Sequence, residues 1–119
     1  MRKTQLRLPR LTLYRDENFR GRIRVFRGNR AIRNIDRIFD EPENLRFRSN
    51  GRGATLVLFS RNNFQGAFRI IRLSRSIADV ERFLGFEVHS IIMSSSRLTL
   101  QQVVTIRRTG RLPQRFRVF

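Results

Sequence analysis

A hairpin-like segment occurs twice in this chain, and this repeat restricts the fold more than any other feature. The copies cover residues 11–26 and 56–71. In each, an alternating apolar run ends in an aromatic residue, a polar turn follows, and Phe-x-Gly begins the next run. The six positions that define the repeat are Tyr14, Phe19, Gly21, Phe59, Phe64 and Gly66.

Each copy has the pattern of an antiparallel β-hairpin. Alternation on both sides of a short polar connector predicts two strands joined by a turn. Asn and Asp in the connectors tolerate left-handed backbone geometry, and glycine suits a position with positive φ. The two aromatic residues of a copy bracket the turn, so we expect their rings to meet and hold the hairpin as a folded corner.

The doubled Tyr/Phe-x-x-x-x-Phe-x-Gly hairpin resembles that of the βγ-crystallin family, in which two Greek keys form one domain. The resemblance implies an all-β, two-sheet Greek-key sandwich with short helical turns, here with extra β-prone termini. We expect a basic arm at residues 1–10, one domain at 11–96 and an extension at 97–119. The keys would cover about 11–53 and 54–96.

Two short helical passages are expected between strands. Ile32, Ile35 and Ile38 have helical spacing before Pro42. In the second half, Ser76 is expected to cap a helix over residues 77–84, with Gly85 as its stop.

Arginines alternate with apolar residues in three runs, at 20–25, 45–48 and 115–118. A period of two places the two residue types on opposite faces of a strand. We therefore expect the arginines to face solvent and the apolar side chains to face the core of the sandwich.

The extension beyond the predicted domain is expected to add β-structure. Residues 98–106 are rich in β-branched side chains, and the chain closes with Arg-Phe-Arg-Val-Phe. Such a strand can join an open sheet edge of the same molecule or of a neighbour. A disordered basic tail is the alternative for residues 107–114.

The charge is extreme. The formal net charge is +17 over 119 residues, and Lys3 is the only lysine among 26 basic residues. Arginine binds phosphate and carboxylate through two parallel hydrogen bonds, so this bias favours contact with anions. A solvated cationic surface and GC-rich coding are the competing explanations. The candidate contacts with a polyanion are Arg20, Arg22, Arg24, Arg46, Arg48, Arg115 and Arg117.

The family resemblance implies a test for calcium, whose motif is Asn/Asp-Asn/Asp-x-x-Ser/Thr-Ser before the last strand of each key. The first key has Phe-Asp-Glu-Pro-Glu-Asn at residues 39–44, and we aligned the second key on residues 82–87. Both depart from the motif, and arginine follows the first hairpin aromatic. We expect no cofactor and no metal site, with weak calcium binding at Asp40, Glu41 and Glu43 as the disfavoured alternative.

Enzymatic activity is not expected. The chain lacks cysteine, a metal-spaced ligand set and a phosphate-binding loop, and its lone histidine, His89, lies in an alternating strand. No small-molecule substrate is evident. No segment has the pattern of a signal peptide or a membrane span, which predicts an intracellular protein, with release or a spore-associated location as alternatives.

Three functional hypotheses follow. The first is a non-enzymatic structural protein that self-associates through its terminal arms. The second is a protein that binds nucleic acid or another acidic polymer through arginine rows. The third is a calcium-binding stress or spore protein.

Overall fold

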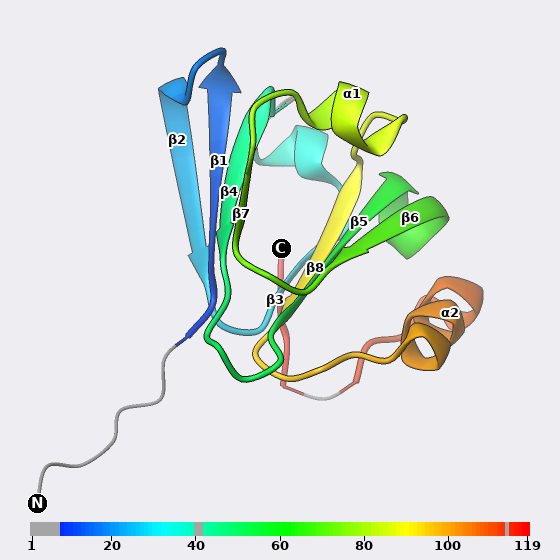
Figure 1. Cartoon of the computed structure of the whole chain (residues 1–119). Helices are drawn as coiled ribbons and strands as arrows, with labels where there is room; N and C mark the ends of the chain where they lie inside the picture. Colours follow the sequence, from blue (N-terminus) through cyan, green and yellow to red (C-terminus); the bar gives the residue numbers. More distant parts are fainter. Residues whose placement is uncertain (1–7, 40–41, 114) are drawn as a thin grey trace, which may run out of the picture.

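Two β-sheets face each other in the computed structural model, which describes residues 8–39, 42–113 and 115–119 (Figure 1). Sheet A has the strand order β2-β1-β4-β7. Its strands are β1 (Arg10–Asp16), β2 (Arg20–Arg27), β4 (Asn44–Arg48) and β7 (Arg75–Ile77). Sheet B has the order β6-β5-β8-β3-β9. Its strands are β3 (Arg30–Ile32), β5 (Thr55–Arg61), β6 (Gln65–Ile71), β8 (Ser90–Ser94) and β9 (Arg117–Val118).

The two halves of the chain exchange one strand each. β3 of the first half pairs with β8 in sheet B, and β7 of the second half pairs with β4 in sheet A. This exchange makes one domain from two four-stranded units and confirms the predicted two-sheet Greek-key sandwich. Equivalent backbone bonds link the halves, from Ile35 N to His89 O at 2.8 Å and from Val80 N to Glu43 O at 3.0 Å.

Both hairpins contain the aromatic corner. The rings of Tyr14 and Phe19 meet edge-on with centroids 5.3 Å apart, and those of Phe59 and Phe64 lie 5.7 Å apart. A left-handed Asn-Phe pair turns the chain in each copy, and Gly66 follows the second pair with a φ of 82°. The corner geometry is therefore repeated along with the sequence.

The space between the sheets is filled by the inward side chains of both. Leu11, Leu13, Leu45 and Phe47 of sheet A are buried against Leu56, Leu58, Ile91 and Met93 of sheet B. η1 (Ile35–Arg37) and α1 (Val80–Leu84) close one end of this core through Ile35, Val80 and Leu84.

A helix covers the other face of sheet B, where a strand was predicted. Residues 98–106 were expected to be β-structure, but Leu100–Thr109 form α2. Thr99 and Gln102 exchange side-chain and backbone hydrogen bonds in a capping box, and Gly110 ends the helix in left-handed geometry. This cap and the tertiary contacts override the β-propensity of the β-branched residues.

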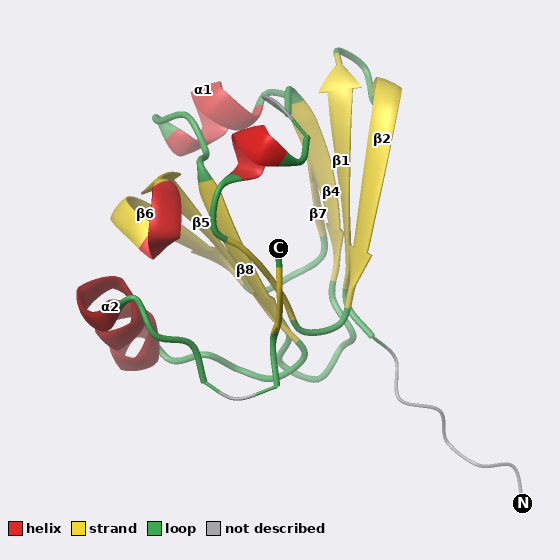
Figure 2. Ribbon diagram, turned by 180° about the vertical axis from the view of Figure 1, so that it is seen from behind, coloured by secondary structure: helices red, strands yellow, loops and turns green. Residues whose placement is uncertain are grey.

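The helix α2 adds a third layer to the sandwich. Val103 and Ile106 are buried against Val57, Phe59 and Ile92 on the face of sheet B that points away from sheet A. Figure 2 shows α2 on that side of the sheet. The central strands of sheet B are consequently buried from solvent on both faces, which explains why β5 and β8 are nearly continuous apolar runs.

The end of the chain adds a strand to its own sheet. β9 pairs in parallel with β3, and Phe119 N donates to Ala31 O at 2.7 Å. Phe116 packs on the α2 side of sheet B, and Phe119 packs on the core between the sheets. Val118 is 45% exposed, so the inward position predicted for it by alternation is wrong.

Two local predictions need correction. Ser76 lies in β7 and does not cap a helix; Asp79 caps α1 by accepting from Arg82 N, because the chain continues in the sheet to Ile77. Gly85 ends α1 as predicted. The helical passage after Ile32 is the single 3-10 turn η1.

The facing of β2 is opposite to the prediction. Phe26 pairs with Leu11 and is buried, so Arg24 lies on the same inward side, while Ile23 and Val25 lie outward and are 53% and 39% exposed. β2 is an edge strand, and Arg24 reaches solvent at the rim of the core with its guanidinium 5.3 Å from the Phe26 ring. The Phe26 side chain, which is larger than those of Ile23 and Val25, occupies the core and thereby decides which face of β2 points inward.

Replacing Ile106 by Ala should lower the free energy of unfolding by about 2–4 kcal/mol, because it removes a buried side chain between α2 and sheet B. Val104→Ala on the exposed side of α2 is the control and should cost about 0.5 kcal/mol or less. Urea denaturation measures both. Equal effects would show that α2 does not stabilise the sandwich.

Gly66→Ala should destabilise the fold by more than Gly110→Ala. Both glycines have positive φ, which costs a substituted residue about 1 kcal/mol. At Gly66 a Cβ would also collide with the Ser60 hydroxyl, which is held by the Ala67 backbone N–H at 2.8 Å, whereas at Gly110 it meets open space. Thermal unfolding of the two variants compares them, and equal melting temperatures would contradict this account.

Candidate anion-binding face

The outer face of sheet A carries a row of arginines on three neighbouring strands. Arg10 of β1 pairs directly with Arg27 of β2 on one side and with Arg48 of β4 on the other. Directly opposed residues of an antiparallel pair project from the same face, so the three guanidinium groups share one side of the sheet. Like charges in this arrangement repel one another, and the sheet gains nothing from them on its own.

A second row beside the first is rich in hydroxyl groups. Thr12 pairs with Arg46, and Arg46 pairs with Ser76. A shallow cavity of about 300 Å³ lies over both rows. Its lining consists of Arg10, Thr12, Tyr14, Arg46, Phe47, Arg48, Ser74, Arg75 and Ser76. We call this surface, together with Arg27, the arginine face.

The arginines of this face lack carboxylate partners. Within residues 8–39, 42–113 and 115–119, no carboxylate oxygen lies within 4 Å of a nitrogen of Arg10, Arg27, Arg46 or Arg48. An incoming oxyanion would therefore relieve repulsion without breaking an existing ion pair. The hydroxyls of Thr12 and Ser76 supply further donors beside the guanidinium groups.

The aromatic corner of the first hairpin positions one of these arginines. The guanidinium carbon of Arg46 lies 4.2 Å from the centroid of the Phe19 ring and 5.7 Å from that of Tyr14. Stacking on aromatic faces restricts the side chain while leaving its edge donors available. The hairpin motif thus has a direct contact with the arginine face.

The seven arginines named from the sequence separate into different places. Arg46 and Arg48 belong to the arginine face, whereas Arg20 and Arg22 are exposed along β2. Arg24 of β2 and Arg117 of β9 both lie over the Phe119 ring, with their guanidinium carbons 6.0 and 5.5 Å from its centroid. Arg115 is exposed in the loop before β9, with a φ of 74°.

Arg10 and Arg27 were missed by the sequence analysis. They flank the first hairpin symmetrically, and the hairpin register that places them opposite each other follows from the repeat. Counting outward from the turn, where Asp16 faces Arg20, would pair Arg10 with Phe26; the register shift between Tyr14 and Asp16 is what brings Arg27 opposite Arg10. The position of Arg48 beside Arg10 depends on the pairing of β1 with β4 and had no local signal.

The described residues at the end of each calcium motif have a structural role. Asn44 and Ser90 donate to the equivalent carbonyls of Asp16 and Arg61, at 2.8 and 2.6 Å. This equivalence places the motif of the second key on residues 85–90, so the alignment to residues 82–87 is wrong. Glu43 is exposed, and Asp40 and Glu41 lie outside the described residues.

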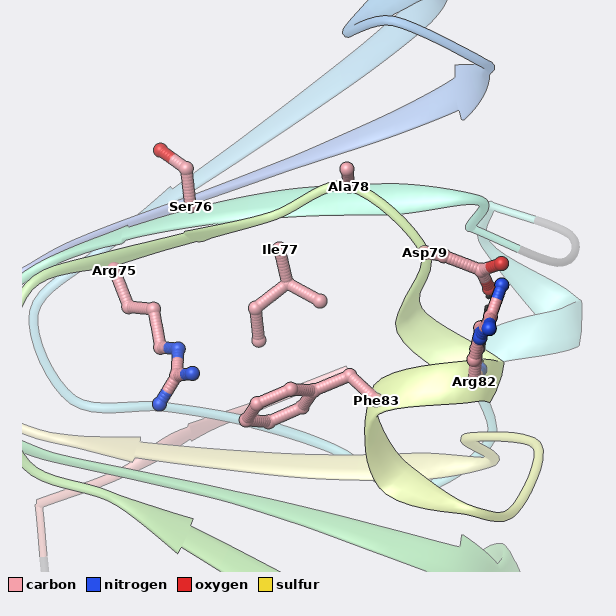
Figure 3. Close-up of a pocket in the computed structure, with 7 residues that line it drawn as sticks. All are labelled: Arg75, Ser76, Ile77, Ala78, Asp79, Arg82 and Phe83. Carbon is pink, nitrogen blue, oxygen red and sulfur yellow. Dashed lines mark hydrogen bonds between the residues drawn. The ribbon is translucent and has the colours of Figure 1, made fainter.

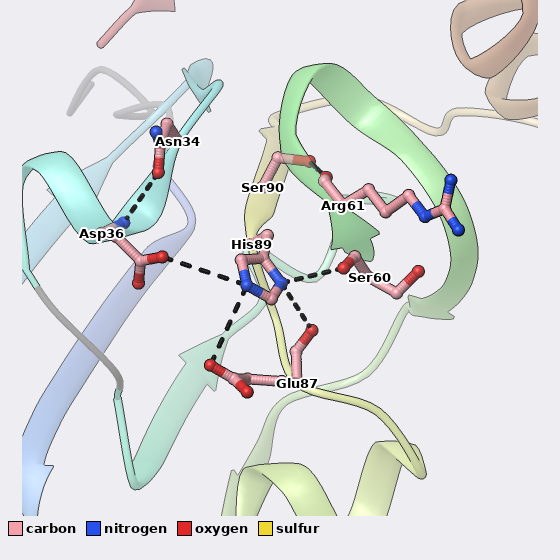
Figure 4. Close-up of polar contacts among 7 residues, drawn as sticks. All are labelled: Asn34, Asp36, Ser60, Arg61, Glu87, His89 and Ser90. Carbon is pink, nitrogen blue, oxygen red and sulfur yellow. Dashed lines mark hydrogen bonds and ion pairs between the residues drawn. The ribbon is translucent and has the colours of Figure 1, made fainter.

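In the second key, a histidine occupies the corner. His89 Nδ1 lies 2.8 Å from Ser60 O and 3.1 Å from Glu87 O, two backbone carbonyls that can only accept a hydrogen bond, so Nδ1 acts as the donor. Nε2 lies 3.9 Å from the carboxylates of Asp36 and Glu87 (Figure 4). Calcium requires six to eight oxygen ligands, and an imidazole in their midst does not suit it. The part of the chain that the structure describes contains no group of three or more metal-ligating side chains.

Known proteins share this fold but not a recognisable sequence. No family model and no curated protein matches the chain. A solved structure described as "Evolution of the eye lens beta-gamma-crystallin domain fold" aligns over 79% of this chain and 93% of its own, with a TM-score of 0.58 and 17% identity. IPSE/alpha-1 from Schistosoma mansoni eggs aligns over 71% of this chain and 82% of its own, with a TM-score of 0.54 and 20% identity. The chain therefore has a βγ-crystallin-like fold, which by itself assigns no activity.

Within the described residues, neither α1 nor α2 is long and apolar enough to cross a bilayer.

Sulfate should stabilise the protein through the arginine face. A ligand that binds only the folded state at ten times its dissociation constant adds about 1.4 kcal/mol, so the melting temperature should rise with sulfate relative to chloride at equal ionic strength. The double variant Arg10→Gln, Arg48→Gln should lose most of this rise.

The matched control for that measurement is Arg20→Gln, Arg22→Gln, which removes the same charge from exposed positions outside the cavity. It should keep the sulfate response. Loss of the response in both variants would show that net charge, and not the arrangement on sheet A, is responsible.

Proposed function

We propose that this protein is a non-enzymatic, structural βγ-crystallin-like domain whose arginine face binds anionic polymers. The observation that carries the proposal is the position of Arg10, directly opposite both Arg27 and Arg48 with no carboxylate within 4 Å among the described residues. An uncompensated row of this kind costs stability unless an anion binds it. The net charge of +17 would add long-range attraction to any polyanion.

The chemistry of the face favours sulfate and phosphate groups over specific bases. Its donors are guanidinium and hydroxyl groups. The ring of Tyr14 in its lining and that of Phe19 beside it are already contacted by Arg46, and Phe47 is buried in the core. Proteins that bind single-stranded nucleic acids offer free aromatic side chains on which the bases stack. Binding should therefore follow charge density and be largely independent of sequence.

Self-association through the terminal arms is a second proposal. β9 and α2 engage the domain's own sheet B, so the C-terminal extension would have to be released before it could exchange. The observation in favour of assembly is that β2 forms an edge of sheet A among the described residues and exposes Ile23 and Val25 there. A single monomeric species in sedimentation at high protein concentration would remove this proposal.

Binding to labelled duplex DNA should weaken steeply as salt is raised. The double variant Arg46→Gln, Arg48→Gln should reduce the slope of log K against log salt by about 1.8, because each lost phosphate contact removes about 0.9. Fluorescence anisotropy over a salt series measures the slope.

The charge-matched control is again Arg20→Gln, Arg22→Gln. The slope of log K against log salt for this control should stay closer to that of the parent protein. With heparin in place of DNA, the parent and the two double variants should rank in the same order of affinity. If the two double variants behave alike, binding is spread over the whole cationic surface and the arginine face is not its site.

A further inference from the structure

A groove with an apolar lining opens along the edge of the sandwich, between β6 of sheet B and β7 of sheet A. It measures about 650 Å³, and Ile70, Leu73, Phe83 and Leu100 contribute to its lining. Leu73, in the loop between β6 and β7, is 79% exposed, and Leu100, at the start of α2, is 59% exposed. Both leucines line the same groove. We call them, together with Ile70 and Phe83, the apolar patch, and exposed apolar groups of this kind mark interaction surfaces.

An adjoining pocket of about 240 Å³ lies beneath β7. Figure 3 shows Arg75 and Phe83 pointing into the space between the sheets, while Ser76 points away toward the arginine face. Arg75 and Phe83 line both the groove and this pocket. The groove therefore continues toward the interior at this edge.

Arginines surround the apolar patch. The guanidinium carbons of Arg69 and Arg75 lie 4.4 and 4.3 Å from the centroid of the Phe83 ring, and Arg69 Nη1 also donates to Phe83 O at 3.4 Å. Arg72, in the loop between β6 and β7, also lines the groove, and its Nη1 donates to Thr55 Oγ1 at 3.3 Å. Its pKa is lowered by burial and by the positive charge of Arg97. In the described part of the chain none of these arginines has a carboxylate oxygen within 4 Å.

We infer that this edge groove docks on the surface of an anionic membrane, with Leu73 and Leu100 entering the headgroup boundary and Arg69, Arg72 and Arg75 binding lipid phosphates. Charge complementarity selects an anionic surface, and the exposed leucines select one with an accessible apolar layer. A nucleic acid or a sulfated polymer would neutralise the arginines but has no place for the leucines. A small amphipathic ligand held in the groove is the competing occupant, which monomeric decyl phosphate tests below.

Membrane docking is independent of polymer binding at the arginine face. The two surfaces share only Ser74 and Arg75, at the loop that enters β7. Variants of Arg46 and Arg48 should therefore weaken heparin binding and leave docking on vesicles largely intact. Loss of one activity does not require loss of the other.

The chain contains no tryptophan, so Leu73→Trp introduces a single fluorescent reporter at the groove. Its emission should shift to shorter wavelength with vesicles of phosphatidylcholine and phosphatidylserine, and stay unchanged with phosphatidylcholine alone. Val104→Trp, on α2 but outside the groove, should not shift. Vesicle binding without a shift at position 73 would overturn insertion, and an equal shift with monomeric decyl phosphate would assign the groove to a small amphiphile.

A second measurement removes the apolar contacts. Leu73→Ser, Leu100→Ser should weaken partitioning onto the phosphatidylserine vesicles by about tenfold for each leucine, while Val104→Ser should have little effect. High salt screens the attraction between the arginines and the lipid phosphates. The parent should then still bind the vesicles through its leucines, whereas the double variant should not bind. All these side chains are exposed, so the urea midpoint should hardly change and heparin binding should be equal. Partitioning of the double variant at the level of the parent would overturn the inference.

Discussion

The aromatic corner is the constraint on which the rest of the structure depends. In each hairpin, the contact between two rings and the left-handed Asn-Phe turn fix where the strands reverse, and this fixes the register of β1 with β2 and of β5 with β6. The buried Asn44 and Ser90 extend that control to the next strand, because each donates to a backbone carbonyl at its hairpin turn. Register in turn decides which side chains face the core, since a shift of one residue would move all of them to the other face.

The two halves of the domain share a backbone plan but differ in what lies outside their sheets. Thr12 of the first hairpin corresponds to Val57 of the second, and this difference recurs in the neighbouring strands. Sheet A keeps a wet outer face with arginines and hydroxyls, whereas sheet B is covered by α2. The outer face of sheet A is thus available to a ligand, whereas the corresponding face of sheet B is buried under α2 and stabilises the fold.

The cationic surface has an arrangement that net charge alone does not describe. Guanidinium groups are stacked on rings at several places, as Arg46 is on Phe19 and Arg75 on Phe83. Cation–π contacts hold arginine without neutralising it, so its hydrogen-bond donors remain available to anions. The result is a polar region on sheet A and a mixed apolar and cationic region at the sheet edge, which suit different partners.

The sequence by itself determined the hairpins and their aromatic corners, because these depend on contacts within a few residues of a turn. The two-sheet class was implied by the resemblance of the doubled hairpin to that of βγ-crystallins, since the pairing of β3 with β8 and of β4 with β7 is long-range. The sequence also determined the outward position of Arg46 and Arg48, where apolar alternation was unambiguous. Only the tertiary structure decided the facing of β2, because Phe26 and Val25 competed for the core and the partner strand chose Phe26. It likewise decided that residues 100–109 are helical, since their apolar positions pack on the face of sheet B that points away from sheet A. The candidate sites belong to this second group: Arg10 lies opposite Arg48, and Leu73 and Leu100 line one groove, only because distant segments pack together.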